Sequence, residues 1–172
     1  LINNIAQWFD IDAFELLNNS FGGSGYDIAC AQNNSPIVYQ LKDEKPIVKP
    51  ISFYPNFTNQ IYFVYLNQKQ NSKDAIKNYF NKRGEIGHFV EKINELTNTI
   101  IATTDFKIFA NAIREHEVEI SIILEQQTVQ ETYFDDFEGV VKSLGAWGGD
   151  FVMVISKENP KKFAFSMACF KA

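Results

Sequence analysis

The chain has 172 residues and a formal charge of −5, from 16 Lys and Arg against 21 Asp and Glu. Its hydrophobic content of 45%, with 16 Phe and 7 Tyr, is sufficient for a folded core and excludes a disordered chain. No basic stripe stands out, and nucleic acid is not an expected partner because phosphate binding needs clustered Lys and Arg. The two Cys lie far apart with no CxxC pair, and the chain has only two His, so we expect no zinc site, which needs about four such ligands at suitable spacing.

Cysteine placement and hydropathy indicate the compartment. Cys30 and Cys169 lie far apart among apolar neighbours, and we expect both to be buried, reduced thiols of a cytoplasmic protein. No apolar run approaches the ~20 residues that span a bilayer, and no secretory signal is visible, so we expect no membrane contact. The opening stretch LINNIAQWF already has the pattern of a helix interior with no capping residue before Leu1, so we expect a fragment of a longer protein.

Three short helices and a β-hairpin are predicted for the first part of the chain. The pattern predicts helices in 1–19, a turn at 22–25, a helix at 26–32, and strands at 36–41 and 46–53. Asp12 is expected to begin the second helix as its cap. Pro46 and Pro50 place the last strand at a sheet edge, because proline cannot donate to a strand ladder. The segment 54–60 is expected to link two lobes.

The second part of the chain alternates strands with longer helices. The pattern predicts a strand at 61–66, helices at 72–82, 89–100 and 106–124, and strands at 139–147, 151–156 and 163–170. Ser72 and Asp105 are expected to cap the first and third of these helices. His116 falls on the apolar stripe of the last helix, where we expect a hydrogen-bonded residue at the edge of the core. Long helices among scattered strands indicate an α+β sandwich with helices on one face of an antiparallel sheet.

The stretch 22-GGSGYDIACAQ-32 joins a glycine-rich turn to a single carboxylate. Its three glycines allow positive φ and a close approach of the backbone to a ligand. Ser24 is expected to cap the following helix and to leave N–H groups that favour an anion. Asp27 is either an ordinary first-turn residue that stabilises the helix end, or the group that accepts or orients a hydroxyl proton in phosphoryl transfer. The spacing of these residues leaves both interpretations open.

A second glycine turn, 145-GAWGGD-150, lies between two apolar strands. Its glycines would permit a tight loop whose backbone N–H groups face a phosphate. The alternative is a plain hairpin, although hairpin loops are usually shorter and polar, and Trp147 is unusual in one.

Together, the two glycine turns resemble those of the GHMP small-molecule kinases. GSGYDIA in the first turn and K-x-x-G-A-x-G-G-D in the second follow the family's pattern, and GSGYDIACA is similar to the mevalonate and phosphomevalonate kinase branch. The order of the elements agrees over nearly the whole chain. The resemblance implies a two-lobed α+β fold. Residues 1–55 would complete the N-terminal catalytic lobe, and residues 56–172 would form a C-terminal α/β sandwich with an antiparallel, ferredoxin-like sheet.

The resemblance also implies roles for particular residues. The family's aspartate beside the accepting hydroxyl makes Asp27 the catalytic candidate. The late glycine loop, which in the family holds nucleotide phosphates, corresponds to Gly145, Ala146, Gly148 and Gly149. Residues 67–72 loosely match the family's T-G-K-x-x-S/T stretch. Substrate contacts are therefore expected from Ser24, Gly25, Tyr26, Lys69 and Ser72.

The sequence departs from the family at several points. The family's main ATP loop, P-x-x-x-G-L-G/S-S-S, and the lysine that partners the catalytic aspartate are absent, and Trp147 stands where a glycine is usual. We therefore expect ATP and Mg²⁺ to be bound by the full-length protein, while this fragment alone is inactive and has no metal site of its own. The carboxylates within 135–138 are expected to form a solvated face, and His88 is expected to be exposed.

These features predict an ATP-dependent phosphotransferase of the mevalonate route, acting on mevalonate or phosphomevalonate. The alternative is a non-catalytic GHMP-fold binding or assembly module, which keeps the fold without the chemistry. Asp27 favours the enzyme and Trp147 favours the module. The predicted partners are a small-molecule substrate and ATP. A lobe without its neighbour is also expected to expose apolar surface and to form homo-oligomers.

Overall fold

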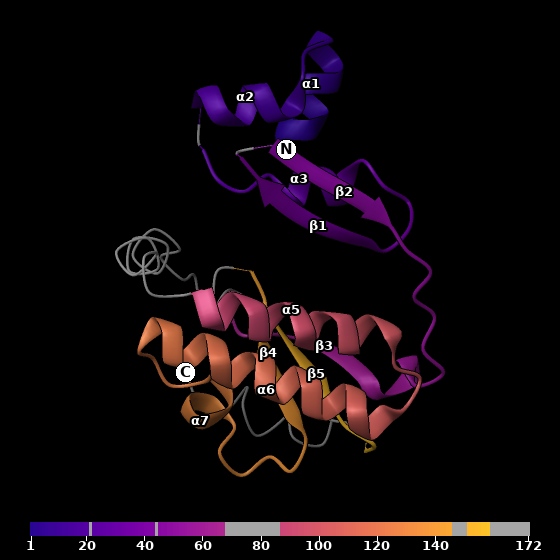
Figure 1. Cartoon of the computed structure of the whole chain (residues 1–172), viewed down its shortest axis with the longest axis vertical. Helices are drawn as coiled ribbons and strands as arrows, with labels where there is room; N and C mark the ends of the chain where they lie inside the picture. The colour runs from indigo at the N-terminus through magenta and orange to yellow at the C-terminus, as the bar shows by residue number, and fades with distance from the viewer. Residues whose placement is uncertain (21, 44, 68–86, 146–150, 159–172) are drawn as a thin grey trace. The chain divides into compact units, whose positions relative to one another are not determined.

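The computed structural model describes residues 1–20, 22–43, 45–67, 87–145 and 151–158 (Figure 1). The chain divides into two compact units, Leu1–Tyr54 and Pro55–Ala172. Each unit has its own helices and its own antiparallel sheet. The predicted helix at 72–82 and the predicted strand at 163–170 lie outside the described residues.

Three short helices and one hairpin make up the first unit, as the sequence predicts. Their bounds are α1 Ile2–Phe9, α2 Ala13–Ser20, α3 Tyr26–Ala31, β1 Ile37–Lys42 and β2 Lys45–Pro50. Asp12 begins α2 as predicted, because its carboxylate accepts the Glu15 N–H at 2.8 Å. β1 and β2 pair antiparallel, with Ile37 opposite Pro50. In the described part of this sheet β2 pairs with β1 alone, so its prolines lie on an edge.

The core of the first unit is small. All three helices contribute to it, through Ala6, Ala13, Leu17 and Ile28. Asn3 is buried as well, and its side-chain oxygen accepts a hydrogen bond from the Gln32 amide at 3.1 Å. This contact satisfies a buried polar group and ties the end of α3 to α1.

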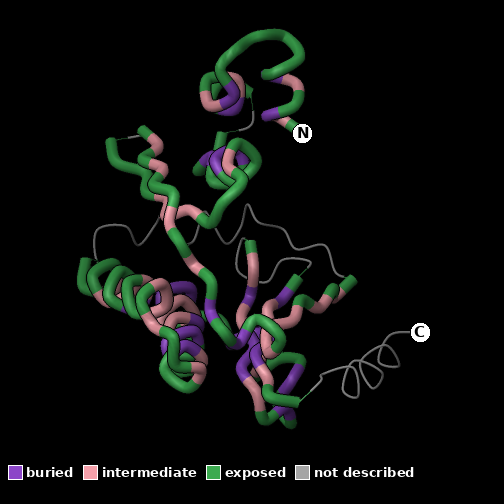
Figure 2. The backbone as a smooth tube through the Cα atoms, turned by 90° about the vertical axis from the view of Figure 1, so that its right-hand side faces the viewer, coloured by how far each residue is buried: buried purple, intermediate pink, exposed green. Residues whose placement is uncertain are grey.

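The described part of the second unit contains a three-stranded sheet and two long helices. In chain order its elements are η1 Thr58–Gln60, β3 Ile61–Tyr65, α5 Gly87–Ala102, α6 Phe106–Leu124, α7 Val129–Tyr133, β4 Val140–Ser143 and β5 Phe151–Ile155. The described strands lie in the order β3-β5-β4, and both pairs are antiparallel. α5 packs along α6, and α6 contacts β4. Figure 2 shows buried residues where these helices and strands face one another. None of the described helices has both the length and the apolar character needed to cross a membrane.

Side-chain caps determine where two helices of the second unit begin. Asp105 accepts the N–H groups of Lys107 and Ile108 at 2.7 and 3.0 Å, as predicted for the start of α6. The start of α7 was not predicted. There, the Thr128 hydroxyl accepts the Glu131 N–H at 3.1 Å, and the Glu131 carboxylate accepts the Thr128 N–H at 2.8 Å. This reciprocal pair is a capping box, which satisfies two N–H groups at once.

Both faces of the three-stranded sheet carry buried residues. On one face Val141 lies opposite Val154, and both pack with Phe137, which follows α7. On the other face Val140 lies opposite Ile155, and these two are also buried. The segment around α7 therefore also packs against the sheet, in addition to the helices that were predicted to do so.

Side chains close the outer edge of β4. The Val141 N–H donates to the Gln130 side-chain oxygen, and the Ser143 N–H donates to the Glu117 carboxylate, each at 3.1 Å. The Gln130 amide donates in turn to the Gly139 carbonyl at 3.2 Å. An open strand edge exposes unpaired N–H groups. These contacts give the N–H groups of Val141 and Ser143 hydrogen-bond partners and link β4 to α6 and α7.

Candidate functional site

The first candidate site lies where the glycine turn enters α3. Gly25 is the N-cap of this helix, has a φ of 74°, and is buried. A Cβ atom at this position would lie 2.8 Å from two ring carbons of Phe14, so glycine alone suits both the backbone and the packing. The cap residue is therefore Gly25, and the prediction that Ser24 caps the helix is wrong.

Ser24 instead connects the turn to its two flanking elements. Its hydroxyl accepts the Tyr26 N–H at 3.4 Å, and its carbonyl accepts a hydrogen bond from the Tyr39 hydroxyl of β1. The rings of Tyr26 and Tyr39 meet edge to face, with their centroids 5.7 Å apart. Ser24, Gly25 and Tyr26, which were predicted to bind substrate, thus lie together with Asp27 in one short segment.

Asp27 is exposed in the first turn of α3. Within the described part of the chain its carboxylate takes part in no hydrogen bond or ion pair. Burial, and after it the negative charge of Asp27, raises the pKa of the Tyr39 hydroxyl. Tyr39 therefore stays protonated near neutral pH and can donate to Ser24. Tyr39 was not predicted, because only the folding of the hairpin brings β1 against the turn.

Cys30 differs from the prediction of a buried thiol. It is free and exposed, while its neighbours Ile28 and Ala29 are buried. Successive residues of a helix point about 100° apart, so a residue beside two buried ones can face solvent. A hydrogen bond with Cys30, followed by burial, raises the pKa of Tyr26. Cys169 lies outside the described residues.

The structure describes only the first glycine of the second turn. Gly145 follows β4 with a φ of 72°, and the Leu144 N–H donates to the Phe151 carbonyl at 3.2 Å. The turn therefore joins two neighbouring antiparallel strands. The remaining candidates lie outside the described residues: Lys69, Ser72, Ala146, Trp147, Gly148 and Gly149.

A buried polar cluster that the sequence analysis did not predict joins α6 to the end of β4. Glu117 is 5% exposed, and its carboxylate accepts hydrogen bonds from the Ser143 N–H at 3.1 Å, the Ser143 hydroxyl at 2.9 Å and the Lys142 ammonium at 3.3 Å. Burial lowers the pKa of Lys142, and Glu117 opposes this effect. The sequence holds a signal for the cluster, because Glu117 lies four residues after Ile113 and three before Ile120 on the apolar stripe.

His116 is partly buried beside this cluster. This agrees with the predicted position at the edge of the core, but its buried Nδ1 atom has no hydrogen-bond partner among the described residues. Burial, together with the positive charge of Lys142, lowers the pKa of His116 from 6.5 to about 4, and Glu117 partly opposes them. The imidazole is therefore neutral at physiological pH. His88 is exposed, as predicted.

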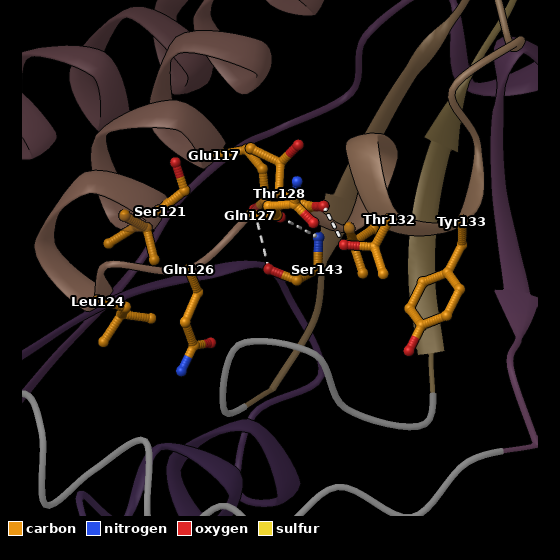
Figure 3. A pocket seen from close by; sticks show the side chains of 11 residues that line it. Glu117, Ser121, Leu124, Gln126, Gln127, Thr128, Thr132, Tyr133 and Ser143 are labelled. Atoms are coloured by element: carbon orange, nitrogen blue, oxygen red, sulfur yellow. Dashed lines mark hydrogen bonds between the residues drawn. The ribbon is translucent and has the colours of Figure 1, made fainter.

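A pocket of about 310 Å³ opens beside Glu117 (Figure 3). In this view Ser121 and Leu124, near the end of α6, lie on one side of the pocket, and Thr132 and Tyr133 of α7 lie on the other. Glu117 and Ser143 lie between the two sides and are both buried. The second unit therefore contains a polar pocket that the sequence analysis did not predict.

Comparison with known proteins supports the fold and no closer relationship. No protein-family model matches the chain, and no curated protein matches it. Its fold is similar to that of a Lin0012 protein from Listeria innocua, with a TM-score of 0.67 and 18% identity over 98% of this chain and 59% of that chain. It is also similar to L. major mevalonate kinase in complex with R-mevalonate, with a TM-score of 0.64 and 15% identity over 92% of this chain and 52% of that chain. The chain thus spans little more than half the length of either protein. At these identities the likeness concerns the fold, and it confirms the predicted α+β architecture.

Proposed function

We propose that the protein is an ATP-dependent small-molecule kinase of the GHMP type, acting in the cytoplasm on mevalonate or phosphomevalonate, with Asp27 as its catalytic residue. One observation carries the proposal. The chain has the fold of a mevalonate kinase over 92% of its length and places an exposed carboxylate without a partner among the described residues directly after the GSG turn. Because it spans 52% of that kinase, the proposal concerns the whole protein to which this chain belongs.

With mevalonate as the acceptor, Asp27 acts on the hydroxyl group that receives the phosphoryl group. A carboxylate oxygen of Asp27 accepts a hydrogen bond from this hydroxyl and then its proton. The hydroxyl oxygen meanwhile bonds to the γ-phosphorus of ATP, and the bond from that phosphorus to ADP breaks. Tyr39 supports this role by holding the Ser24 carbonyl, which keeps the turn beside Asp27 in one conformation. Tyr26 and Ser24 would contact the polar groups of the acceptor.

Magnesium supplies charge neutralisation of the nucleotide phosphates in reactions of this class. The described residues contain no group of three or more His, Cys, Asp or Glu side chains that could hold a metal ion. Asp135, Asp136 and Glu138 are exposed, as expected of a solvated face. The proposal therefore assigns no Mg²⁺ ligand to these residues, and Mg²⁺ commonly takes much of its coordination from phosphates and water.

The test is ATP consumption by the whole protein with mevalonate and with phosphomevalonate, for wild type and Asp27→Asn. We expect one substrate to be used and kcat to fall about 10²-fold or more in the variant, because a positioned general base contributes about 10²- to 10⁴-fold. Glu15→Gln is the matched control, since Glu15 is an exposed carboxylate in the first turn of the neighbouring helix α2, and it should leave kcat unchanged.

Two results would contradict the proposal. If neither substrate were used, the assigned acceptors would be wrong. If the Asp27→Asn variant kept the wild-type kcat, the assigned catalytic residue would be wrong. ATP binding measured by calorimetry without any turnover would favour the non-catalytic binding module instead.

A further inference from the structure

We propose that the pocket between the end of α6 and α7 binds a small ligand through a primary ammonium group. The pocket has a volume of about 310 Å³, at the lower end of the range of small-molecule sites. The described residues that line it all belong to the second unit, and none of them is part of the proposed catalytic set. The inference therefore goes beyond the kinase proposal and does not depend on it.

Three of the hydroxyl groups that line the pocket have already used their protons. Each hydroxyl has one O–H donor and two acceptor lone pairs. Ser121 donates to the Val118 carbonyl at 2.8 Å, and Thr132 donates to the Thr128 carbonyl at 2.9 Å. Ser143 donates to the Glu117 carboxylate at 2.9 Å. These three oxygens can therefore offer a ligand lone pairs only, and they select hydrogen-bond donors.

The charges around the pocket favour the same ligand. Among the described residues that line it, Glu117 alone is charged, and none of these residues is Lys, Arg or His. The Lys142 ammonium lies 3.3 Å from the Glu117 carboxylate and offsets part of its charge. The preference for a cation therefore rests chiefly on the hydroxyl acceptors and on the C-terminal end of α6 at Leu124. Helix carbonyls carry partial negative charge at such an end. The amides of Gln126 and Gln127 can donate or accept and set no preference. A primary ammonium group brings three donors and a positive charge, which match this lining.

The size and depth of the pocket limit the ligand further. Glu117 and Ser143 are buried, whereas Gln126, Gln127 and Thr132 are exposed at the opening. Ile120, Leu124 and Val129 provide apolar surface in the same pocket. The ligand class is therefore an alkyl ammonium ion, with its charged end toward the hydroxyls and a short carbon chain against the aliphatic side chains.

The experiment follows the backbone amide NMR signals of Ser121, Thr132 and Ser143 while ethylammonium is added to the protein. Ethanol serves as the neutral probe of nearly the same shape, and acetate serves as the anion. We expect saturable shifts with ethylammonium, weaker ones with ethanol, and none with acetate. Equal shifts with ethanol and ethylammonium, stronger binding of acetate, or no shift at these residues would each overturn the proposal.

Thr132→Val removes one acceptor from the pocket without exposing a buried polar group. The Thr128 carbonyl keeps the Thr132 N–H as a donor at 3.1 Å, so the helix is retained. Loss of one hydrogen bond should weaken ethylammonium binding about 2- to 10-fold. Thr99→Val is the matched control, because the Thr99 hydroxyl makes the same backbone contact, to Glu95 at 3.0 Å, in the separate groove between α5 and α6. Equal binding by the two variants would refute the assignment.

Discussion

Gly25 shows how a single residue connects the glycine turn to the helices beneath it. Both a positive φ and the nearness of the Phe14 ring exclude a side chain at this position. Gly22 has a similar φ of 67°, yet a Cβ there would meet nothing within 4 Å. The two glycines therefore separate the cost of the backbone conformation from the cost of the packing clash.

Gly25→Ala should destabilise the protein more than Gly22→Ala. Both variants incur the strain of a left-handed backbone, about 1–2 kcal/mol. The first also forces Phe14 to move, which should lower the free energy of unfolding by a further ~1–3 kcal/mol. Urea unfolding followed by the amide NMR signals of the first unit measures the difference. Equal losses in the two variants would show that the contact with Phe14 does not limit this position.

His116 makes stability depend on pH. In the folded state its pKa is about 4, against 6.5 when it is unperturbed. Between these values the unfolded chain binds a proton that the folded chain does not, so stability is lost as the pH falls from 6.5 towards 4. The full shift corresponds to about 3 kcal/mol, and the partial exposure of the ring reduces this to about 1–2 kcal/mol.

Replacement of His116 by Gln should flatten this pH dependence. Denaturant unfolding of wild type and variant at a series of pH values between 4 and 6.5 measures it. His88→Gln, at an exposed position, is the control and should leave the wild-type slope intact. A variant that retains the full wild-type slope would show that other groups, such as buried carboxylates, cause the acid sensitivity.

At the scale of the elements, α7 depends on its capping box. A helix of five residues satisfies few N–H groups by itself, so the contacts between Thr128 and Glu131 are a large part of what holds it. The hydrogen bonds from Thr128 also lower the pKa of Glu131, so the box loses stability when the pH falls through that lowered value. The sequence T-x-x-E was available as a signal, but no long apolar stripe accompanies it.

Thr128→Ala should lower the free energy of unfolding by about 0.5–2 kcal/mol, the usual cost of losing an N-cap. Chemical denaturation followed by circular dichroism measures this loss. Thr132→Ala, in the same helix but outside the box, is the control and should cost less. If the two substitutions were equally harmful, the capping box would not be what stabilises α7.

The local sequence predicted where helices and strands begin more reliably than it predicted which side chains are buried. The helices after Asp12 and Asp105 begin as predicted, because each carboxylate reaches an N–H group only two or three residues away. Among the described residues of the strand predicted at 139–147, only Val140–Ser143 form a strand, and the positive φ of Gly145 belongs to the turn. The predicted linker at 54–60 includes the boundary between the two units, and it contains the buried Phe57, whose ring lies 4.9 Å from that of Phe109.

At the scale of the whole molecule, the two units differ in the cores they build. The first unit relies on small side chains such as Ala6 and Ala13, whereas the second buries several phenylalanines and valines. The first unit also leaves apolar residues of α1 in solvent. Trp8 is 83% exposed and Phe9 67%, and their rings stack on one another. Exposed apolar patches of this kind promote association.

We therefore predict that the chain by itself self-associates through α1. Light scattering should show an apparent mass that rises with protein concentration, and the double substitution Trp8→Ser with Phe9→Ser should reduce the rise. Tyr54→Ser is the control, because Tyr54 is equally exposed, at 83%, but lies outside α1. A clean monomer at high concentration would contradict the prediction, as would a double variant that associates as strongly as wild type.

The sequence by itself determined the α+β class, the described helices and strands apart from η1 and α7, and the place of Asp27 just after the first glycine turn. These properties depend on spacings of two to four residues, which govern helix caps, strand alternation and turns. Only the tertiary structure decided that Gly25 meets Phe14, that Tyr39 holds the turn through Ser24, and that Glu117 is the buried polar group on α6. Each of these contacts joins residues 11 to 26 positions apart. Contacts between residues so far apart in sequence form only when the elements pack together. The packing therefore decides which side chains are buried and which partners they contact.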